Sequence, residues 1–220
     1  MRRLFIALLT LAACAVGLPA QAQGPGVDPD TLVLIAKPDL TDPEYRQTVL
    51  LVTPMGGDRH IGVIINRPTS RSLATLFPEH EPSKKVIDPV YFGGPFGRTA
   101  VFAIVKAKQN PGGGAIPFSK DLYFCARVDQ VDRIIETTPN DARYYVGYVG
   151  WRPGELRQEL DRGLWYVMDA DTDLVFRKNP QTMWEELVRR SRQLTTDAGG
   201  LPQWQRAALA SAAMPALPAR

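Results

Sequence analysis

Three apolar runs of strand length follow one another in the first third of the chain. They lie at residues 32–36 (LVLIA), 48–54 (TVLLVTP) and 61–68 (IGVIINRP), and only short connections separate them. Short connections suit antiparallel strands, whereas two parallel strands need a crossover of about a dozen residues or more. The runs therefore predict an antiparallel meander rather than alternating βαβ units.

Strand and helix patterns are mixed after this meander. Four helices are expected: after Ser70, from Asp129 to before Pro139, between Pro153 and Gly163, and from Asn179 onward. Further strands are expected at residues 89–92, 99–107, 122–128, 143–150, 164–170 and 173–176, with a loop at 108–117 (KQNPGGGAIP). About eight short strands and four helices predict an α+β fold, in a single compact domain with a mixed or largely antiparallel sheet.

The first 22 residues have the composition of an export signal. Arg2 and Arg3 precede an apolar run at residues 4–16, and residues 20–22 (AQA) form an A-x-A cleavage signal. The apolar run is too short for a comfortable transmembrane span. We therefore expect residues 1–22 to be a signal peptide and the mature protein to be periplasmic, without a transmembrane span.

A second processing route stays open. The sequence LAAC at residues 11–14 resembles a bacterial lipobox, which would make Cys14 a lipid anchor and the protein a membrane-anchored lipoprotein. After the signal we expect a linker at residues 23–30 and the folded domain at residues 31–194. The Ala/Pro-rich composition of residues 195–220 predicts a flexible tail.

The charge balance gives no sign of nucleic-acid binding. The chain has 26 basic and 23 acidic residues, and the expected signal peptide holds two of the basic residues and no acid. The mature chain is thus close to neutral, whereas nucleic-acid binders carry a strongly basic domain or face. No nucleic-acid partner is predicted.

The spacing of acidic residues does not indicate a metal site. Asp169, Asp171 and Asp173 have the first three spacings of a calcium loop. Leu174 stands where the loop needs glycine, however, and Pro180 stands where a bidentate glutamate belongs. These acids are better explained as a solvated turn, and no metal is predicted.

The sequence also lacks recognisable catalytic motifs. Cys125 lies in an apolar run, which favours a buried structural thiol, and the two histidines, His60 and His80, lie near loop sequence. The glycines of NPGGGAIP lack the Lys-Ser/Thr of a phosphate-binding loop, and no G-x-S-x-G occurs. We expect no cofactor, and an enzyme is the less favoured interpretation.

Three turns remain as candidate binding elements. Asn and Arg end an apolar strand, two glycines form a tight corner, and a Trp-Arg-Pro-Gly sequence opens a helix whose unpaired N–H groups suit an anion. The candidate ligand residues are Asn66, Arg67, Gly93, Gly94, Trp151, Arg152 and Gly154. Each also has a structural explanation, as a turn residue, a close backbone approach or a packed corner.

Five segments in order resemble the YqgE/AlgH family of bacterial proteins. They are LIAKPDLTDPEYRQTVLLV, IGVIINRP, PVYFGGP, YVGYVGWRPGELRQEL, and WYVMDADTDLVF followed by MWEEL, and together they span residues 34–187. The resemblance implies one compact α+β domain without a known cofactor or an established catalytic activity. Glu155 departs from the glutamine that is common in this family.

Three functional hypotheses follow. The first is a non-enzymatic binding or accessory protein of the cell envelope, whose partner is an unidentified protein or a small anionic ligand. The second is an enzyme of unrecognised type that pairs Arg67 with Glu155 or Asp42. The third is a transcriptional regulator, as family members are often labelled, although an exported protein would not reach the chromosome.

Overall fold

A computed structural model of the chain describes residues 31–197, with side chains to residue 194. The expected signal peptide, the linker, Cys14 and residues 198–220 of the expected tail lie outside the described residues. The last helix continues to Asp197, so three residues that were assigned to the tail are helical.

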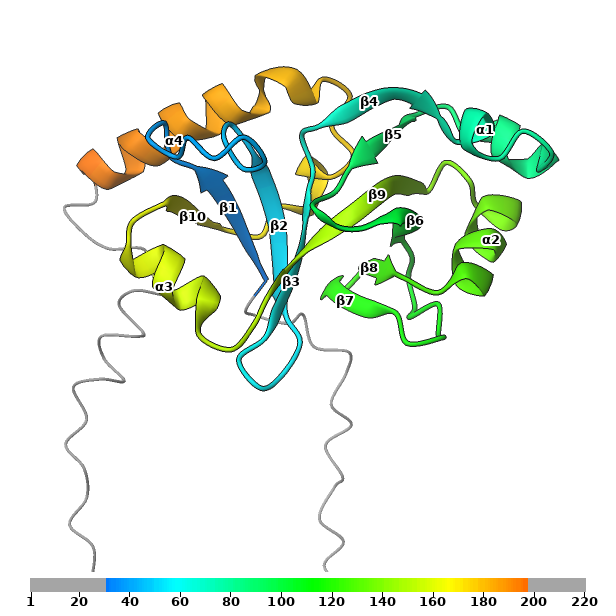
Figure 1. Cartoon of the computed structure of the whole chain (residues 1–220), viewed down its shortest axis with the longest axis horizontal. Coiled ribbons are helices and arrows are strands. Elements are labelled where there is room, and N and C mark those ends of the chain that lie inside the picture. Colours follow the sequence, from blue (N-terminus) through cyan, green and yellow to red (C-terminus); the bar gives the residue numbers. More distant parts are fainter. Residues whose placement is uncertain (1–30, 198–220) are drawn as a thin grey trace, which may run out of the picture.

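One curled sheet of ten strands dominates the described part of the chain (Figure 1). Its strands are β1 (Leu32–Ala36), β2 (Val49–Pro54), β3 (His60–Ile64), β4 (Pro68–Ser72), β5 (Pro89–Phe92), β6 (Phe96–Lys106), β7 (Ile116–Ser119), β8 (Leu122–Cys125), β9 (Ala142–Trp151) and β10 (Trp165–Asp169). The helices are α1 (Leu73–Leu76), α2 (Val128–Thr137), α3 (Glu155–Asp161) and α4 (Met183–Asp197), with short 3-10 helices η1 (Glu81–Lys85), η2 (Thr172–Leu174) and η3 (Pro180–Thr182).

The strand order is β10-β1-β2-β3-β9-β6-β8-β7, and β4 and β5 form a ribbon beside β9. The strand pairs are antiparallel except for β5 with β9. The sheet curls until β7 returns to β2, where Thr53 Oγ1 donates to the carbonyl of Pro117 at 3.3 Å. The predicted meander of β1, β2 and β3 is confirmed, as is the α+β fold with four helices.

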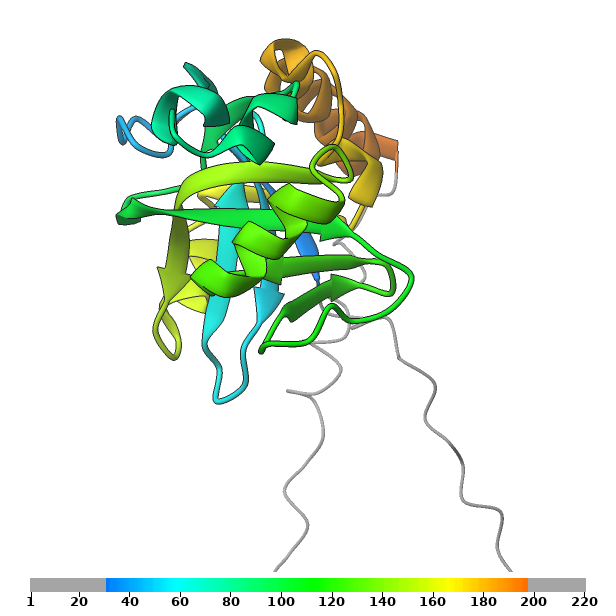
Figure 2. The ribbon, with the colours of Figure 1, turned by 90° about the vertical axis from the view of Figure 1, so that its right-hand side faces the viewer.

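The helices cover different faces of this sheet. Apolar side chains inside the curl form one core, which α4 covers through Met183, Leu187 and Val188. The outer face has two further cores, one under α3 and one under α1 and α2. Figure 2 shows α2 lying across the strands on this outer face.

Three expected elements differ from the structure. The helix expected after Ser70 begins only at Leu73 with Ser72 as its cap, because residues 68–72 pair with β5 as strand β4. Residues 173–176 were expected to be a strand. Instead, Asp173 and Leu174 belong to the 3-10 helix η2, whose start is capped by the side chain of Asp171, which accepts the backbone N–H of Asp173. Val175 is buried there without pairing in a ladder, so its apolar character reflects burial rather than strand formation. In the expected loop at 108–117, Ile116 begins β7, an edge strand that tolerates Pro117.

Candidate functional site

The side chain of Asn66, which follows β3, hydrogen-bonds the backbone at the start of β2. Its side-chain oxygen accepts the N–H of Val49 at 2.8 Å, and its amide donates to the carbonyl of Gln47 at 2.9 Å. Gln47 has a positive φ of 57°, a conformation that is strained for a residue with a side chain. Asn66 therefore holds the irregular entry into β2, and both ends of its amide are used in doing so.

Arg67 binds the backbone of the chain itself. Its Nη1 donates to the carbonyl of Glu44 at 2.7 Å, and its Nη2 donates to that of Arg46 at 2.8 Å. Burial, together with the nearby charge of Arg46, lowers the pKa of Arg67. The guanidinium thus fastens the turn at residues 42–47.

The two glycines at 93 and 94 allow a backbone crossing. A Cβ on Gly93 would lie 2.2 Å from the carbonyl oxygen of Gly147, and one on Gly94 would lie 2.3 Å from that of Tyr148. These are backbone contacts, which no side-chain rotation relieves. The glycines therefore let the β5–β6 connection cross β9 at closest approach.

The Trp-Arg-Pro-Gly turn is satisfied internally. The indole N–H groups of Trp151 and Trp165 both donate to Oε2 of Glu159, at 3.0 and 2.9 Å. The carboxylate of Glu155 accepts the backbone N–H of Arg152 at 2.7 Å and so occupies the place expected for an external anion. Gly154 supplies the left-handed residue, with φ 82°, at which α3 begins.

The candidate turns do not meet in one site. Trp151 pairs with His60 at the first residue of β3, whereas Asn66 and Arg67 follow the opposite end of that strand. At about 3.3 Å per residue the two turns lie about 20 Å apart. The Trp-Arg-Pro-Gly turn is therefore separated from Asn66 and Arg67. The Gly93–Gly94 corner lies beside Arg67, because the N–H of Ile64 donates to the carbonyl of Gly93 and the N–H of Phe92 donates to that of Arg67, both at 2.9 Å. The three turns do not form one continuous surface, and ligand binding at any of them stays a prediction. Neither Glu155 nor Asp42 forms an ion pair with Arg67 among the described residues.

A cavity of about 430 Å³ opens elsewhere, on the outer face of the sheet. The register of β6 on β9 shifts between Phe96 and Val101, so the intervening residues leave the ladder and expose a strip of the sheet. The short helix α1 borders this strip, capped by Ser72, whose Oγ accepts the N–H of Thr75 at 3.1 Å. The cavity residues are Thr69, Ser70, Arg71, Leu76, Phe77, Val90, Phe92, Arg98, Thr99, Ala100, Val101 and Val146.

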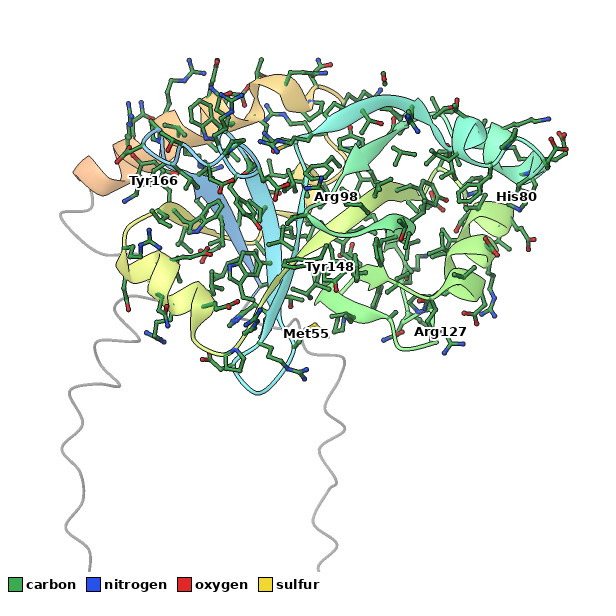
Figure 3. All side chains as sticks on the ribbon, viewed as in Figure 1. Met55, His80, Arg98, Arg127, Tyr148 and Tyr166 are labelled. Atoms are coloured by element: carbon green, nitrogen blue, oxygen red, sulfur yellow. The ribbon has the colours of Figure 1, made fainter. Side chains whose placement is uncertain are left out.

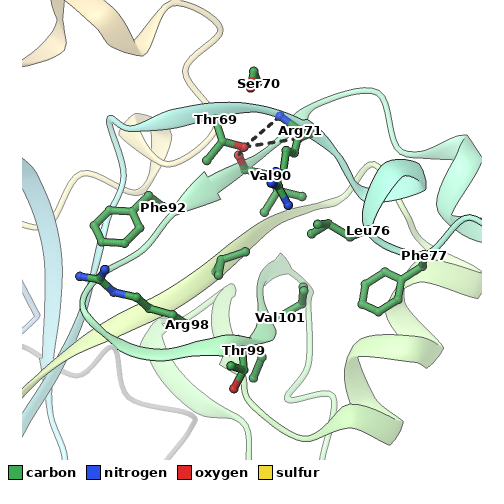
Figure 4. A pocket seen from close by; sticks show the side chains of 12 residues that line it. Thr69, Ser70, Arg71, Leu76, Phe77, Val90, Phe92, Arg98, Thr99 and Val101 are labelled. Atoms are coloured by element: carbon green, nitrogen blue, oxygen red, sulfur yellow. Dashed lines mark hydrogen bonds between the residues drawn. The ribbon is translucent and has the colours of Figure 1, made fainter.

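The floor of this cavity is apolar and its rim carries two arginines (Figure 4). Arg71 extends from β4 and Arg98 extends from β6 toward the ring of Phe92. Thr69 shapes the rim beside Arg71, since its hydroxyl donates to the carbonyl of Val90 at 2.6 Å and accepts the N–H of Arg71 at 3.1 Å. An apolar floor with a few placed polar groups is typical of a small-molecule site, and this volume falls in the usual range.

The two arginines differ in their surroundings. The guanidinium of Arg98 lies 5.3 Å from the ring centroid of Phe92, and its Nη2 contacts the carboxylate of Glu44. Among the described residues the guanidinium of Arg71 has no hydrogen bond or ion pair. Figure 3 shows Arg98 near the middle of the molecule.

Other reactive groups are enclosed. Burial raises the pKa of the Cys125 thiol to about 12, so this thiol is protonated and unreactive at neutral pH. Within residues 31–197 no three His, Cys, Asp or Glu side chains cluster as metal ligands. No helix in the same range is long and apolar enough to cross a membrane.

The sequence is similar to a known protein family and to several of its bacterial members. The sequence model of a family described as AlgH-like matches residues 33–194. A UPF0301 protein of Chlorobium limicola is 29% identical over 160 residues, covering 71% of this chain and 83% of the relative. A UPF0301 protein of Nocardia farcinica is 32% identical over 166 residues, covering 72% of this chain and 75% of the relative.

Solved structures share the fold. The solution structure of the AlgH protein from Pseudomonas aeruginosa matches with a TM-score of 0.60 and 23% identity, over 82% of this chain and 97% of that one. A crystal structure of a protein from Corynebacterium diphtheriae matches with a TM-score of 0.59 and 22% identity, over 72% and 85% of the two chains. At this level of identity the likeness concerns the fold alone.

Sequence reasoning missed the cavity because no local motif encodes it. Its lining comes from β4, β5, β6, β9 and α1, which the topology alone brings together. One signal was available. Arg71 and Arg98 each stand beside a hydroxyl residue at the start of an apolar segment.

Proposed function

This chain belongs to the AlgH-like family, and from that premise we propose that it is a non-enzymatic binding protein whose ligand occupies the cavity between α1 and β6. The ligand class that fits is a small amphipathic carboxylate. One observation carries the proposal: the guanidinium of Arg71 has no partner among the described residues, and it borders an apolar floor.

The floor and the rim of the cavity would each contact a different part of one ligand. Val90, Val101 and Val146 offer apolar contact, which favours an alkyl or aryl body. The guanidinium of Arg71 presents a planar fork of donors that matches a carboxylate. A molecule with an apolar body and a terminal carboxylate satisfies both parts of the cavity.

The lining favours binding over catalysis. Its polar side chains are arginine, threonine and serine, and it contains no Asp, Glu, His, Cys or Lys. Those five residue types supply most general acids, general bases and activated nucleophiles. The hydroxyl of Thr69 is engaged with the carbonyl of Val90 rather than with a base.

Titration with sodium octanoate tests this proposal. We expect octanoate to shift the amide resonances of Thr99, Val101 and Val146 in a ¹⁵N-labelled protein. Arg71→Gln should weaken octanoate about tenfold, because it removes a charge-assisted hydrogen-bonding partner. The matched control is Arg157→Gln, which removes an exposed arginine from α3 and should leave the affinity unchanged.

Two further probes without a carboxylate sharpen the outcome. Octylamine should not bind and 1-octanol should bind more weakly than octanoate, because both have a similar apolar chain but no carboxylate. Equal affinity for all three probes, or shifts confined to residues outside the cavity, would contradict the proposal.

We also propose that this binding takes place in the cell envelope, after export. The support is the composition of residues 1–22, with Arg2, Arg3 and the AQA sequence. Intact mass of the native protein should show loss of residues 1–22, whereas a diacylglycerol mass on Cys14 would indicate the lipoprotein route. Recovery of the uncleaved chain in the cytoplasm would overturn export and reopen the regulator hypothesis.

A further inference from the structure

In the described part of the chain, only one of the two arginines on the cavity rim has its charge compensated by an acidic side chain. The carboxylate of Glu44 contacts Arg98, while Arg71 has no acidic partner among the described residues. We propose that Glu44 sets the charge selectivity of the cavity, so that it accepts a singly charged carboxylate and disfavours a doubly charged phosphate monoester. This inference rests on the proposed function and concerns the same cavity.

Glu44 is held in place by its own backbone. Its N–H donates to Oδ1 of Asp42 at 2.8 Å, and its carbonyl accepts from Nη1 of Arg67 at 2.7 Å. Arg67 also binds the carbonyl of Arg46, so both sides of the turn are fastened. Arg67 therefore fixes the backbone of Glu44, whose carboxylate contacts Arg98.

Arg98 is committed on three sides. Its Nε donates to the carbonyl of Pro95 at 3.2 Å, its guanidinium lies over Phe92, and its Nη2 contacts Glu44. The side chains of Arg98 and Glu44 are 52% and 43% exposed, so this pair is weak in itself. Its consequence lies in the charge, because Glu44 cancels the positive charge that Arg98 would otherwise present to a ligand.

One uncompensated positive charge remains, on Arg71. A monoanion balances it, whereas the second negative charge of a phosphate monoester would find no second unpaired cation on the rim that the structure describes, because Arg98 is already paired with Glu44. The cavity thus discriminates between two anionic head groups on apolar chains of similar length. Glu44 acts by neutralising Arg98, which leaves a doubly charged head group without a second cation.

The test compares octanoate with octyl phosphate at low salt and pH 8, where the phosphate monoester carries two charges. The wild-type protein should prefer octanoate. Glu44→Gln should shift the ratio of the two affinities about fivefold toward octyl phosphate, and added salt should reduce that shift. Glu136→Gln, which removes an exposed carboxylate from α2, is the matched control and should leave the ratio unchanged.

The outcomes separate this inference from the proposed function. If the wild-type protein binds neither probe in an Arg71-dependent way, the proposed function fails and the inference fails with it. If octanoate binding depends on Arg71 but Glu44→Gln leaves the ratio unchanged, the inference alone is overturned. A shift of the same size in Glu136→Gln would also overturn it, because the effect would then be one of net charge.

Discussion

Replacing Gly147 by alanine is expected to abolish stable folding. The new Cβ would lie 2.1 Å from the carbonyl oxygen of Gly94 and 2.9 Å from that of Phe96. All the contacting atoms belong to the backbone, so relief requires β9 and the β5–β6 connection to separate. The positive φ of 78° adds strain for any residue with a Cβ. We expect a loss of more than about 4 kcal/mol in the free energy of unfolding.

Gly112→Ala is the matched control. Gly112 has nearly the same φ, 80°, but a Cβ there would meet nothing within 4 Å. It should therefore lose only about 1 kcal/mol, from the backbone conformation alone. Urea unfolding followed by tryptophan fluorescence measures both variants, with soluble yield as the readout if Gly147→Ala does not fold. Similar stabilities for the two variants would show that the crossing is not as tight as described.

Replacing Arg143 by methionine has the second-largest expected effect. Arg143 is 1% exposed, and its guanidinium lies 4.4 Å from the ring centroid of Tyr91. Its Nη2 donates to Asp88 at 2.8 Å, and its Nη1 donates to the carbonyls of Val175 and Arg177. It thus joins β9 to the start of β5 and to the segment before α4.

Methionine fills part of the space but leaves these acceptors without their donor. We expect Arg143→Met to lose about 3 kcal/mol of unfolding free energy, because the buried carbonyl of Val175 and the partly buried carbonyl of Arg177 lose their donor. Arg127→Met removes an arginine from an exposed ion pair with Asp129 and should leave the urea midpoint unchanged. An unchanged midpoint for Arg143→Met would mean that water replaces the guanidinium without cost.

Much of the fold was predictable because its signals are local. The apolar runs of β1, β2 and β3 have the length and residue types of buried strands, and short connections restrict them to antiparallel pairing. The predictions for residues 173–176 and for the segment of β7 were wrong because tertiary contacts decide both structures. Tertiary burial made one apolar segment look like a strand, and long-range pairing with β8 turned part of a Gly/Pro-rich loop into one.

The candidate site was less predictable because its contacts join distant parts of the chain. Asn66 and Arg67 do lie at a strand end, as expected, but their partners are backbone groups at residues 43–49. Gly93 and Gly94 likewise pack against the backbone of Gly147 and Tyr148, far away in the sequence. The polarity of these residues was visible in the sequence, whereas the groups that satisfy it depend on the topology.

The most direct test of the account is a crystal structure of the protein with ω-bromooctanoate, whose bromine marks the end of the apolar chain. We expect anomalous bromine density over Val101 and Val146, with the carboxylate within hydrogen-bond distance of the Arg71 guanidinium. We also expect Glu44 to remain in contact with Arg98. Bromine density outside the cavity, or a carboxylate that does not reach Arg71, would contradict the central claim that this cavity binds an amphipathic monoanion.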